Sequence, residues 1–148
     1  MSKTIYCIVG NVKTGKSSLC RALTGISKYG ITPLQLTSGA IENFYVEPRS
    51  LQEKTITISD AIKLIKSTKV DHFIFCLRCN TANGCGRADD YIKQFIKSGF
   101  TIGGVAIIEK KEDCIITSSA NAIYLNAPLS VEPTNTRASI VRKKWRII

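Results

Sequence analysis

A glycine-rich segment near the amino terminus carries the residues with the clearest chemistry. Its sequence matches the Walker A pattern, G-x-x-x-x-G-K-[ST]. Glycines allow backbone angles that turn several N–H groups toward an anion. Lys16 can then pair with the β- and γ-phosphates of a nucleotide, while the Ser17 hydroxyl can bind Mg²⁺. The predicted nucleotide-binding residues of this loop are Gly10, Asn11, Val12, Lys13, Thr14, Gly15, Lys16, Ser17 and Ser18.

The segments around this loop support a P-loop. Residues 4–9 form an apolar run typical of a buried parallel strand, and residues 16–23 place apolar side chains at helical spacing. We expect a loop at 27–33, a hairpin turning at Ser38-Gly39, and a helix capped by Ser59. The expected later strands are 34–37, 41–47, 72–77, 102–108 and 122–125, and the expected helices are 59–66, 88–97 and 133–146.

Alternating strands and helices predict the α/β class, with three layers and a mainly parallel sheet. Ligands of such sheets bind at the carboxyl ends of the strands, which is where this loop begins. The 148 residues suit a single domain spanning 1–148. No apolar run approaches the roughly 20 residues that would cross a bilayer, so we expect no transmembrane segment and a cytoplasmic location.

Six cysteines raise the question of cross-links or zinc. A cytoplasmic protein keeps its thiols reduced, so the interpretation at this point is free thiols and no disulfide. Zinc remains an alternative, with Cys76, Cys79 and Cys85 joined by Cys114 or His72 as the fourth ligand. Cysteines in apolar segments are more typical of small core residues.

Residues 10–25 resemble the first motif of the translation-factor-class GTPases. They read Gly-Asn-Val-Lys-Thr-Gly-Lys-Ser-Ser-Leu-Cys-Arg-Ala-Leu-Thr-Gly. The closest patterns are those of Era-like G domains, the G domain of ferrous-iron transporters and the small ethanolamine-utilisation P-loop proteins. The resemblance implies a P-loop NTPase fold with Ras-like order of elements, acting as a small regulatory or assembly protein. It also implies Mg²⁺-dependent binding of GTP and its slow hydrolysis.

The resemblance assigns further roles around the phosphates. The family's threonine over Mg²⁺ and the γ-phosphate corresponds to Thr37, with Thr32 as the other option. The strand before Asp-x-x-Gly corresponds to the segment ending at Glu47, which could hold Mg²⁺. Ser50 replaces the glycine of that motif, and the guanine-reading asparagine is replaced by Glu109.

Base recognition and hydrolysis rest on other residues. Lys110 would lie along the base, and Glu112 or Asp113 would accept from guanine; Asn126-Ala127 would echo the fifth motif. Lys13 stands where many of these GTPases have a potassium-binding asparagine, so we expect its ammonium to add positive charge in the transition state. Leu51 and Gln52 stand near the place of a catalytic glutamine without matching it, which predicts slow hydrolysis.

Two alternatives and two partner surfaces remain open. One alternative is an ATP-dependent small nucleotide kinase or ATPase, with Arg49, Arg78 and Arg87 as its arginines. The other is a degenerate P-loop scaffold that binds protein or nucleic acid without catalysis. A protein partner would contact the switch-like segment 32–52. Nucleic acid would contact the basic carboxyl terminus, because the net charge of +10 attracts polyanions and much of it lies in 137–146.

Overall fold

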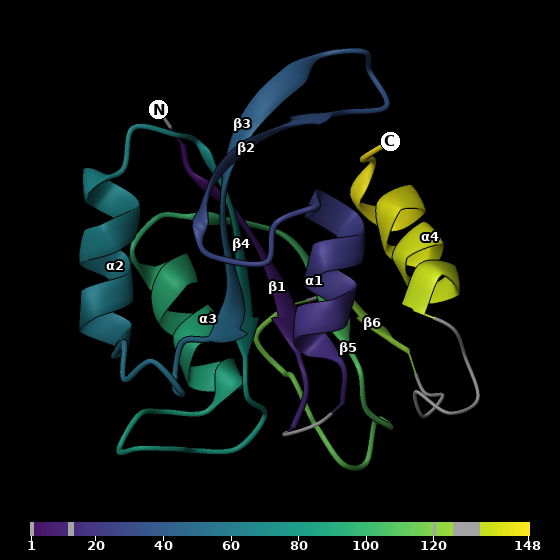
Figure 1. Ribbon diagram of the computed structural model, residues 1–148. Helices are drawn as coiled ribbons and strands as arrows, with labels where there is room; N and C mark the ends of the chain where they lie inside the picture. Colours follow the sequence, from purple (N-terminus) through teal and green to yellow (C-terminus); the bar gives the residue numbers. More distant parts are fainter. Residues whose placement is uncertain (1, 12–13, 120, 126–133) are drawn as a thin grey trace.

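The computed structural model describes residues 2–11, 14–119, 121–125 and 134–148. In these residues the chain forms a six-stranded sheet with helices on both faces (Figure 1). The strands are β1 (Thr4–Val9), β2 (Gly30–Gln35), β3 (Ile41–Ser50), β4 (His72–Leu77), β5 (Thr101–Ile107) and β6 (Ala122–Tyr124). The helices are α1 (Lys16–Thr24), α2 (Ile58–Ser67), α3 (Ala88–Lys97) and α4 (Thr134–Trp145).

The sheet has the strand order β2-β3-β4-β1-β5-β6. β2 pairs antiparallel with β3, and the other neighbouring pairs are parallel. The predicted α/β class with a mainly parallel sheet is therefore confirmed. β4 lies between β1 and β3, so the loop after β1 has the loop after β4 on one side and the loop after β5 on the other. These loops share one edge of the sheet, which we call the carboxyl edge.

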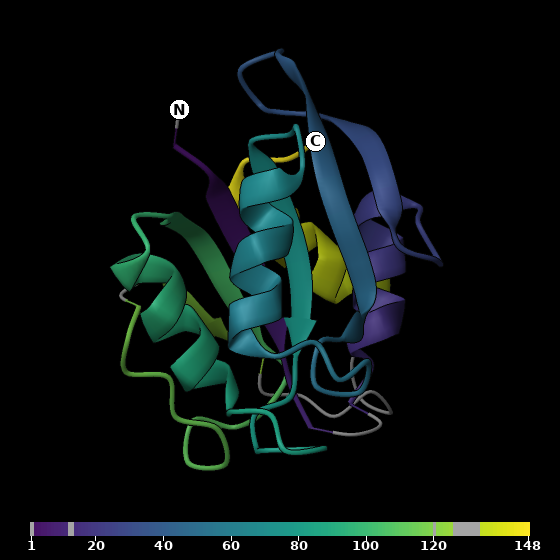
Figure 2. The same cartoon turned by 90° about the vertical axis from the view of Figure 1, so that its left-hand side faces the viewer.

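Helices cover the two faces in pairs, with α1 and α4 on one face and α2 and α3 on the other (Figures 1 and 2). Each pair buries its own hydrophobic cluster against the sheet, centred on Phe73, Phe75 and Phe95 below α2 and α3, and on Leu19, Val141 and Trp145 below α1 and α4. None of the helices in the described ranges is long and apolar enough to cross a membrane. The apolar periodicity of the sequence is thus used for packing within the molecule.

The predicted hairpin at Ser38-Gly39 is confirmed, but its first strand begins earlier than expected. Leu36 and Ala40 close the turn through a backbone hydrogen bond of 2.8 Å, and Gly39 has a φ of 93°. The predicted loop at 27–33 is wrong because β2 already starts at Gly30. Pro33 is compatible with this strand because β2 is an edge strand, where a missing N–H can be tolerated.

The helix predicted at 59–66 is confirmed, but its cap is wrong. Thr57, not Ser59, precedes the first turn and accepts a hydrogen bond from the backbone N–H of Asp60 at 3.2 Å. The carboxylate of Asp60 accepts in return from the N–H of Thr57. This reciprocal capping box satisfies donors that a helix start leaves unpaired.

The expectation of no disulfide is also wrong. Cys79, after β4, and Cys114, after β5, form a disulfide with Cα atoms 5.8 Å apart. The two loops converge because β4 and β5 flank β1, which a separation of 35 residues in sequence does not reveal. Cys7, Cys20, Cys76 and Cys85 are buried free thiols, as expected of small core residues. Among the residues that the structure describes, no group of three or more histidine, cysteine or acidic side chains is arranged for a metal ion.

Candidate functional site

The glycine-rich loop leaves the end of β1 at the carboxyl edge. A Cβ on Gly10 would lie 2.4 Å from the Thr14 hydroxyl oxygen, so any other residue there would displace that hydroxyl. Thr14 donates from that hydroxyl to the Asn11 carbonyl at 2.8 Å, which tightens the loop. Gly15 has a φ of 96°, a left-handed conformation that favours glycine. Gly10 therefore leaves room for the Thr14 hydroxyl, and Gly15 supplies the left-handed backbone at the start of α1.

The start of α1 lies beside this loop. No side chain caps the helix at Gly15, and its first turn contains no acidic residue. The first N–H groups of an α-helix have no partner within the helix, and the helix dipole places partial positive charge at this end. The start of α1 is therefore suited to an anion such as phosphate.

Lys16 places a buried cation at the same point. Its side chain is 7% exposed, and its ammonium donates to the Asn11 carbonyl at 2.9 Å. Burial lowers the pKa of Lys16 because the charged form loses solvation. A cavity of about 200 Å³ opens beside it, lined by Gly15, Lys16, Ser17, Ser18, Ser50 and Glu53. An anion in this cavity would compensate the poorly solvated ammonium.

Ser17 and Glu47, the two predicted Mg²⁺ ligands, are linked only indirectly, through Pro48, the residue that follows Glu47 in the chain. Ser17 donates from its hydroxyl to the Pro48 carbonyl at 2.9 Å. The Glu47 carboxylate is 2% exposed and pairs with the Lys54 ammonium at 2.5 Å. Its second oxygen accepts from the Arg49 backbone N–H at 3.3 Å. A buried carboxylate that already holds a cationic group has the chemistry that a metal ion requires.

On the β5 side, Glu109 contacts the loop directly. Its carboxylate accepts from the Asn11 backbone N–H at 3.0 Å, and the Asn80 amide donates to the Asn11 side chain at 3.3 Å. The resemblance puts an asparagine of base recognition at position 109, whereas here the carboxylate holds the loop itself. Sequence reasoning missed this role because nothing in the pattern links residues 11 and 109.

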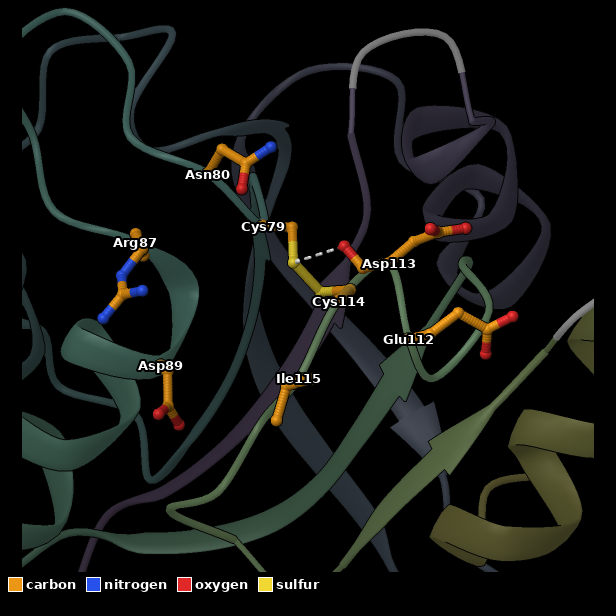
Figure 3. Close-up of a pocket in the computed structure, with 8 residues that line it drawn as sticks. All are labelled: Cys79, Asn80, Arg87, Asp89, Glu112, Asp113, Cys114 and Ile115. Carbon is orange, nitrogen blue, oxygen red and sulfur yellow. Dashed lines mark hydrogen bonds between the residues drawn. A yellow bond between two sulfur atoms is a disulfide. The ribbon is translucent and has the colours of Figure 1, made fainter.

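A second cavity of about 200 Å³ lies between the loops after β4 and β5 (Figure 3). Glu112 and Asp113, predicted to read the base, line it together with Arg87 and the disulfide. Lys110 is exposed in the same loop, where its carbonyl accepts from the Asp113 N–H at 3.0 Å. The predicted base-reading residues thus lie at the carboxyl edge. They follow Glu109 in the chain, and Glu109 separates them from the phosphate loop.

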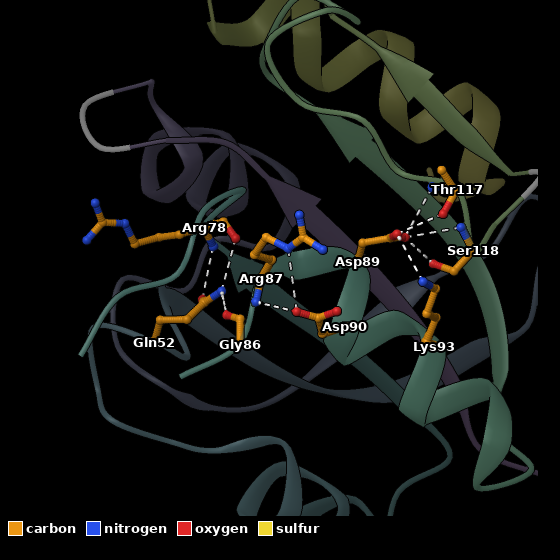
Figure 4. A network of polar contacts seen from close by, with 9 residues as sticks. All are labelled: Gln52, Arg78, Gly86, Arg87, Asp89, Asp90, Lys93, Thr117 and Ser118. Atoms are coloured by element: carbon orange, nitrogen blue, oxygen red, sulfur yellow. Dashed lines mark hydrogen bonds and ion pairs between the residues drawn. The ribbon is translucent and has the colours of Figure 1, made fainter. Parts of the chain in front are cut away.

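Gln52 is a structural residue rather than a free glutamine near the phosphates. It is fully buried, and its amide donates to the Arg78 and Gly86 carbonyls at 3.0 and 3.2 Å (Figure 4). Its side-chain oxygen accepts from the Arg78 N–H at 3.0 Å. All three contacts fix the segment that follows β4, so this side chain is not available to position a water molecule.

The Asp89 carboxylate, at the start of α3, joins α3 to the segment after β5 (Figure 4). Its carboxylate accepts from the backbone and the hydroxyl of both Thr117 and Ser118, at distances between 2.5 and 3.1 Å. Burial raises the pKa of Asp89, but these four bonds outweigh it and hold the pKa below its ordinary value. These hydrogen bonds attach the segment after the disulfide to α3. Sequence reasoning did not predict this role for Asp89.

Thr37 does not belong to the site. It is exposed in the turn of the β2–β3 hairpin, and its N–H donates to the Arg146 carbonyl at the end of α4. Phe44 is level with Thr4, the first residue of β1, and the pair Gln35–Ile41 lies three residues farther from the carboxyl edge. At the usual rise of a strand, the turn is therefore on the order of 25 Å from the phosphate loop. The prediction is wrong because the hairpin turns at the end of the sheet opposite the carboxyl edge. Thr32, the other option, lies in β2, level with the start of β1.

The basic carboxyl terminus divides between packing and surface. Trp145 packs on Tyr6 with ring centroids 5.0 Å apart, and Arg142 donates to the Ala22 carbonyl of α1. Three cations, Lys143, Lys144 and Arg146, line a cavity of about 490 Å³ near the start of β5, away from the phosphate loop. The predictions for Val12, Lys13 and Asn126-Ala127 lie outside the described residues.

Comparison with known proteins found no matching family model, no matching curated protein and no matching solved structure. The functional argument therefore rests on the residues and geometry described above.

Proposed function

We propose that this protein binds a nucleoside triphosphate with Mg²⁺, that GTP is its favoured nucleotide, and that it hydrolyses the nucleotide slowly. The observation that carries the proposal is the buried Lys16 ammonium beside the uncapped start of α1. Both lie on a loop at the carboxyl edge of a parallel sheet, the usual ligand position in such folds. On this proposal the domain is a P-loop NTPase.

The phosphate chain would displace contacts that the loop now makes with itself. The Lys16 ammonium would exchange the Asn11 carbonyl for phosphate oxygens, which are stronger acceptors because they are charged. The N–H groups at the start of α1 would bind the same oxygens. The cavity beside Lys16 would receive the terminal phosphate.

Mg²⁺ would bind between the Ser17 hydroxyl and the Glu47 carboxylate. What supports this is that the Ser17 hydroxyl reaches the carbonyl of Pro48, the residue after Glu47, although β4 separates β1 from β3 in the sheet. The Ser17 oxygen would coordinate the ion through a lone pair while its hydrogen still donates to the Pro48 carbonyl, whereas the Glu47 oxygen that pairs with Lys54 would exchange that ammonium for the ion. The ion would supply positive charge beside the phosphates, and the two side chains would orient it.

Slow hydrolysis follows from the surroundings of Gln52. Its side chain makes three hydrogen bonds to the segment after β4, so the glutamine that follows β3 is not free to position water. The Lys13 contribution stays a prediction. It is tested by comparing hydrolysis in potassium and in sodium: equal rates are expected, and a strong dependence on potassium would contradict it.

Isothermal titration with GTP, ATP and GDP, each with Mg²⁺, tests the proposal. We expect Lys16→Ala to weaken binding about 100-fold, since hydrogen bonds to charged groups are worth about 1.5–3 kcal/mol each. The matched control is Lys28→Ala, which removes an exposed lysine outside the site. Preference for ATP would support a kinase or ATPase. Absence of all nucleotide binding by the folded wild type would support a scaffold without catalysis.

A further inference from the structure

The cavity of about 490 Å³ at the carboxyl end of α4 is more than twice as large as the cavity beside Lys16, and we call it the basic cavity. Its lining includes Tyr6, Gly103, Lys143, Lys144, Trp145 and Arg146. Three of these residues are cations, and no acidic residue is among the described residues that line the cavity. None of the three cations takes part in an ion pair within the described part of the chain. Small-molecule sites have volumes of roughly 300–1,000 Å³, so this one is large enough for a ligand.

The side of the basic cavity that faces the sheet is a fixed surface. The register of β1 on β5 shifts between Ile5 and Tyr6, which makes Gly103 the extra residue of a β-bulge. A Cβ on Gly103 would lie 2.5 Å from the Tyr6 ring. A Cβ on Gly104 would collide with the indole nitrogen of Trp145. Glycine at both positions therefore lets the two buried rings rest directly on the strand, with their centroids 5.0 Å apart.

Arg146 lines this cavity from a backbone conformation that favours glycine. Its φ is 60°, in the left-handed region, and it directly follows α4, where many helices end on a left-handed glycine. The turn is held by the Ile147 N–H, which donates to the Arg142 carbonyl at 2.9 Å, and by the Thr37 N–H, which donates to the Arg146 carbonyl at 2.9 Å. An arginine where glycine would be less strained calls for a reason other than the fold, and ligand sites are where such strain is found.

The helix dipole accounts for only part of this positive charge. The carboxyl end of a helix carries partial negative charge, which Lys143 and Lys144 in the last turn of α4 compensate. The dipole does not require an arginine in the strained residue after the helix. Nor does it require three cations to line one cavity. A bound anion accounts for both features.

We propose that the basic cavity binds a small molecule that carries at least two phosphate groups. A phosphate monoester carries about 1.5–2 negative charges at neutral pH, so two such groups balance three cations. The Arg146 guanidinium presents donors in a planar fork that matches phosphate oxygens, and the two lysines act as point charges. A hollow of this size encloses a small molecule, whereas a nucleic-acid backbone needs positive charge along an extended surface.

This site is separate from the phosphate loop. About 13 Å of strand separates Tyr6 from Gly10 at the start of that loop. The described residues that line the basic cavity include none of those that line the cavity beside Lys16. The inference therefore does not depend on the proposed binding of nucleoside triphosphate.

Arg146→Gly separates binding from stability. Glycine adopts the left-handed conformation without strain, so the ligand-free variant should melt at or above the wild-type temperature. A clearly lower melting temperature would assign Arg146 a structural role and contradict the proposal. Loss of the guanidinium should weaken binding of inorganic pyrophosphate, the simplest molecule with two phosphate groups, by roughly tenfold or more. The matched control is Lys97→Ala, which removes an exposed cation from the last turn of α3, outside the cavity; affinity should stay within about twofold.

The experiment titrates pyrophosphate into protein that carries Lys16→Ala, so that the phosphate loop contributes little to the measured binding. The variants Arg146→Gly, Lys143→Ala with Lys144→Ala, and Lys97→Ala are compared in this background. The double variant changes two exposed side chains, so it tests the cavity without altering the turn at Arg146. Weaker binding in the first two variants but not in Lys97→Ala supports the proposal. Absence of pyrophosphate binding, or equal affinity in all variants, overturns it.

Two further titrations test the class of ligand. Equal affinity for citrate, a tricarboxylate, would overturn the assignment to phosphate. A single-stranded oligonucleotide that binds more tightly than pyrophosphate, and is weakened as much by Lys97→Ala as by Arg146→Gly, would indicate an extended nucleic-acid surface and overturn the small-molecule site. With Lys16 intact, Arg146→Gly should bind GTP with wild-type affinity, and a loss of GTP binding would contradict two separate sites.

Discussion

The two sides of the phosphate loop are held in place by different means. On the β3 side, the Ser17–Pro48 hydrogen bond and the Glu47–Lys54 ion pair join groups that a metal ion would also engage. On the β5 side, the Glu109 carboxylate accepts from the Asn11 N–H, and the loop after β5 that carries Glu109 is itself fixed by the disulfide to the loop after β4 and by hydrogen bonds to Asp89. If the proposed function holds, we expect the β3 side to exchange partners when a ligand binds and the β5 side to serve as a fixed support.

Removal of the disulfide should have the largest effect on stability. Cys79→Ser with Cys114→Ser opens a cross-link spanning 35 residues, and a loop of that size is worth about 3–4 kcal/mol in the chain-entropy model. The melting temperature should fall by roughly 10 °C for a chain of this length. Thermal unfolding of the double variant, and of wild type with and without dithiothreitol, measures the effect. If reduction leaves the melting temperature of wild type unchanged, the β5 side is not supported by the cross-link.

Cys20→Ser serves as a control for the loss of a thiol. Cys20 is buried and free, so its substitution removes no cross-link. The melting temperature of this variant should not respond to dithiothreitol beyond the wild-type response. If the melting temperature of Cys20→Ser no longer responded to dithiothreitol, the redox-sensitive bond would involve Cys20 rather than Cys79 and Cys114.

Asp89→Ala should have the next largest effect, about 2–4 kcal/mol in the free energy of unfolding. It leaves two backbone N–H groups and two hydroxyls without their shared acceptor. Urea unfolding would measure the change. Asp71→Ala is the control, because its ion pair with Lys3 spans 3.9 Å at the surface and should contribute less than about 1 kcal/mol.

The hydrogen bonds to Asp89 also predict that the free energy of unfolding depends on pH. Because the pKa of Asp89 is below its ordinary value in the folded protein, the folded state binds fewer protons here than the unfolded state. The stabilisation is present above the ordinary value of 3.8 and is lost as the pH falls through the lower pKa of the folded state. The difference between wild type and Asp89→Ala should therefore shrink below about pH 4. A constant difference down to pH 2 would contradict this role.

The same contrast explains how much could be predicted from the sequence. Lys16, Ser17 and the elements around them follow a local pattern, since the strand, turn and helix are contiguous and each needs particular residue types. Glu109, Asp89 and the disulfide act through pairs distant in sequence, such as Asn11 with Glu109. Such pairs exist only because β4, β1 and β5 are neighbours in the sheet. Sequence order gave no indication that β4 would lie between β1 and β3.

Glu47→Gln tests whether the β3 side exchanges Lys54 for a metal ion. The amide keeps the shape of the side chain but removes the charge that attracts Mg²⁺. We expect the enhancement of nucleotide binding by Mg²⁺ to fall roughly tenfold, the scale of effects near metal sites. Titration of GTP with Mg²⁺ and with EDTA measures it. Glu42→Gln, in the distant part of β3, should leave the enhancement unchanged; equal effects of the two variants would remove Glu47 from the proposed metal site.

The smallest expected effect distinguishes the hairpin from the site. Thr37→Ala should leave nucleotide affinity and hydrolysis unchanged, because this residue is exposed at the end of the sheet opposite the phosphate loop. Thr14→Ala is its counterpart within the loop. There the hydroxyl donates to the Asn11 carbonyl at 2.8 Å, and its loss should weaken binding by a few fold, about the worth of one hydrogen bond. Titration of GTP into both variants compares them. A loss of affinity in Thr37→Ala as large as that in Thr14→Ala would require the hairpin turn to reach the carboxyl edge, which its pairing with Arg146 and Ile147 opposes.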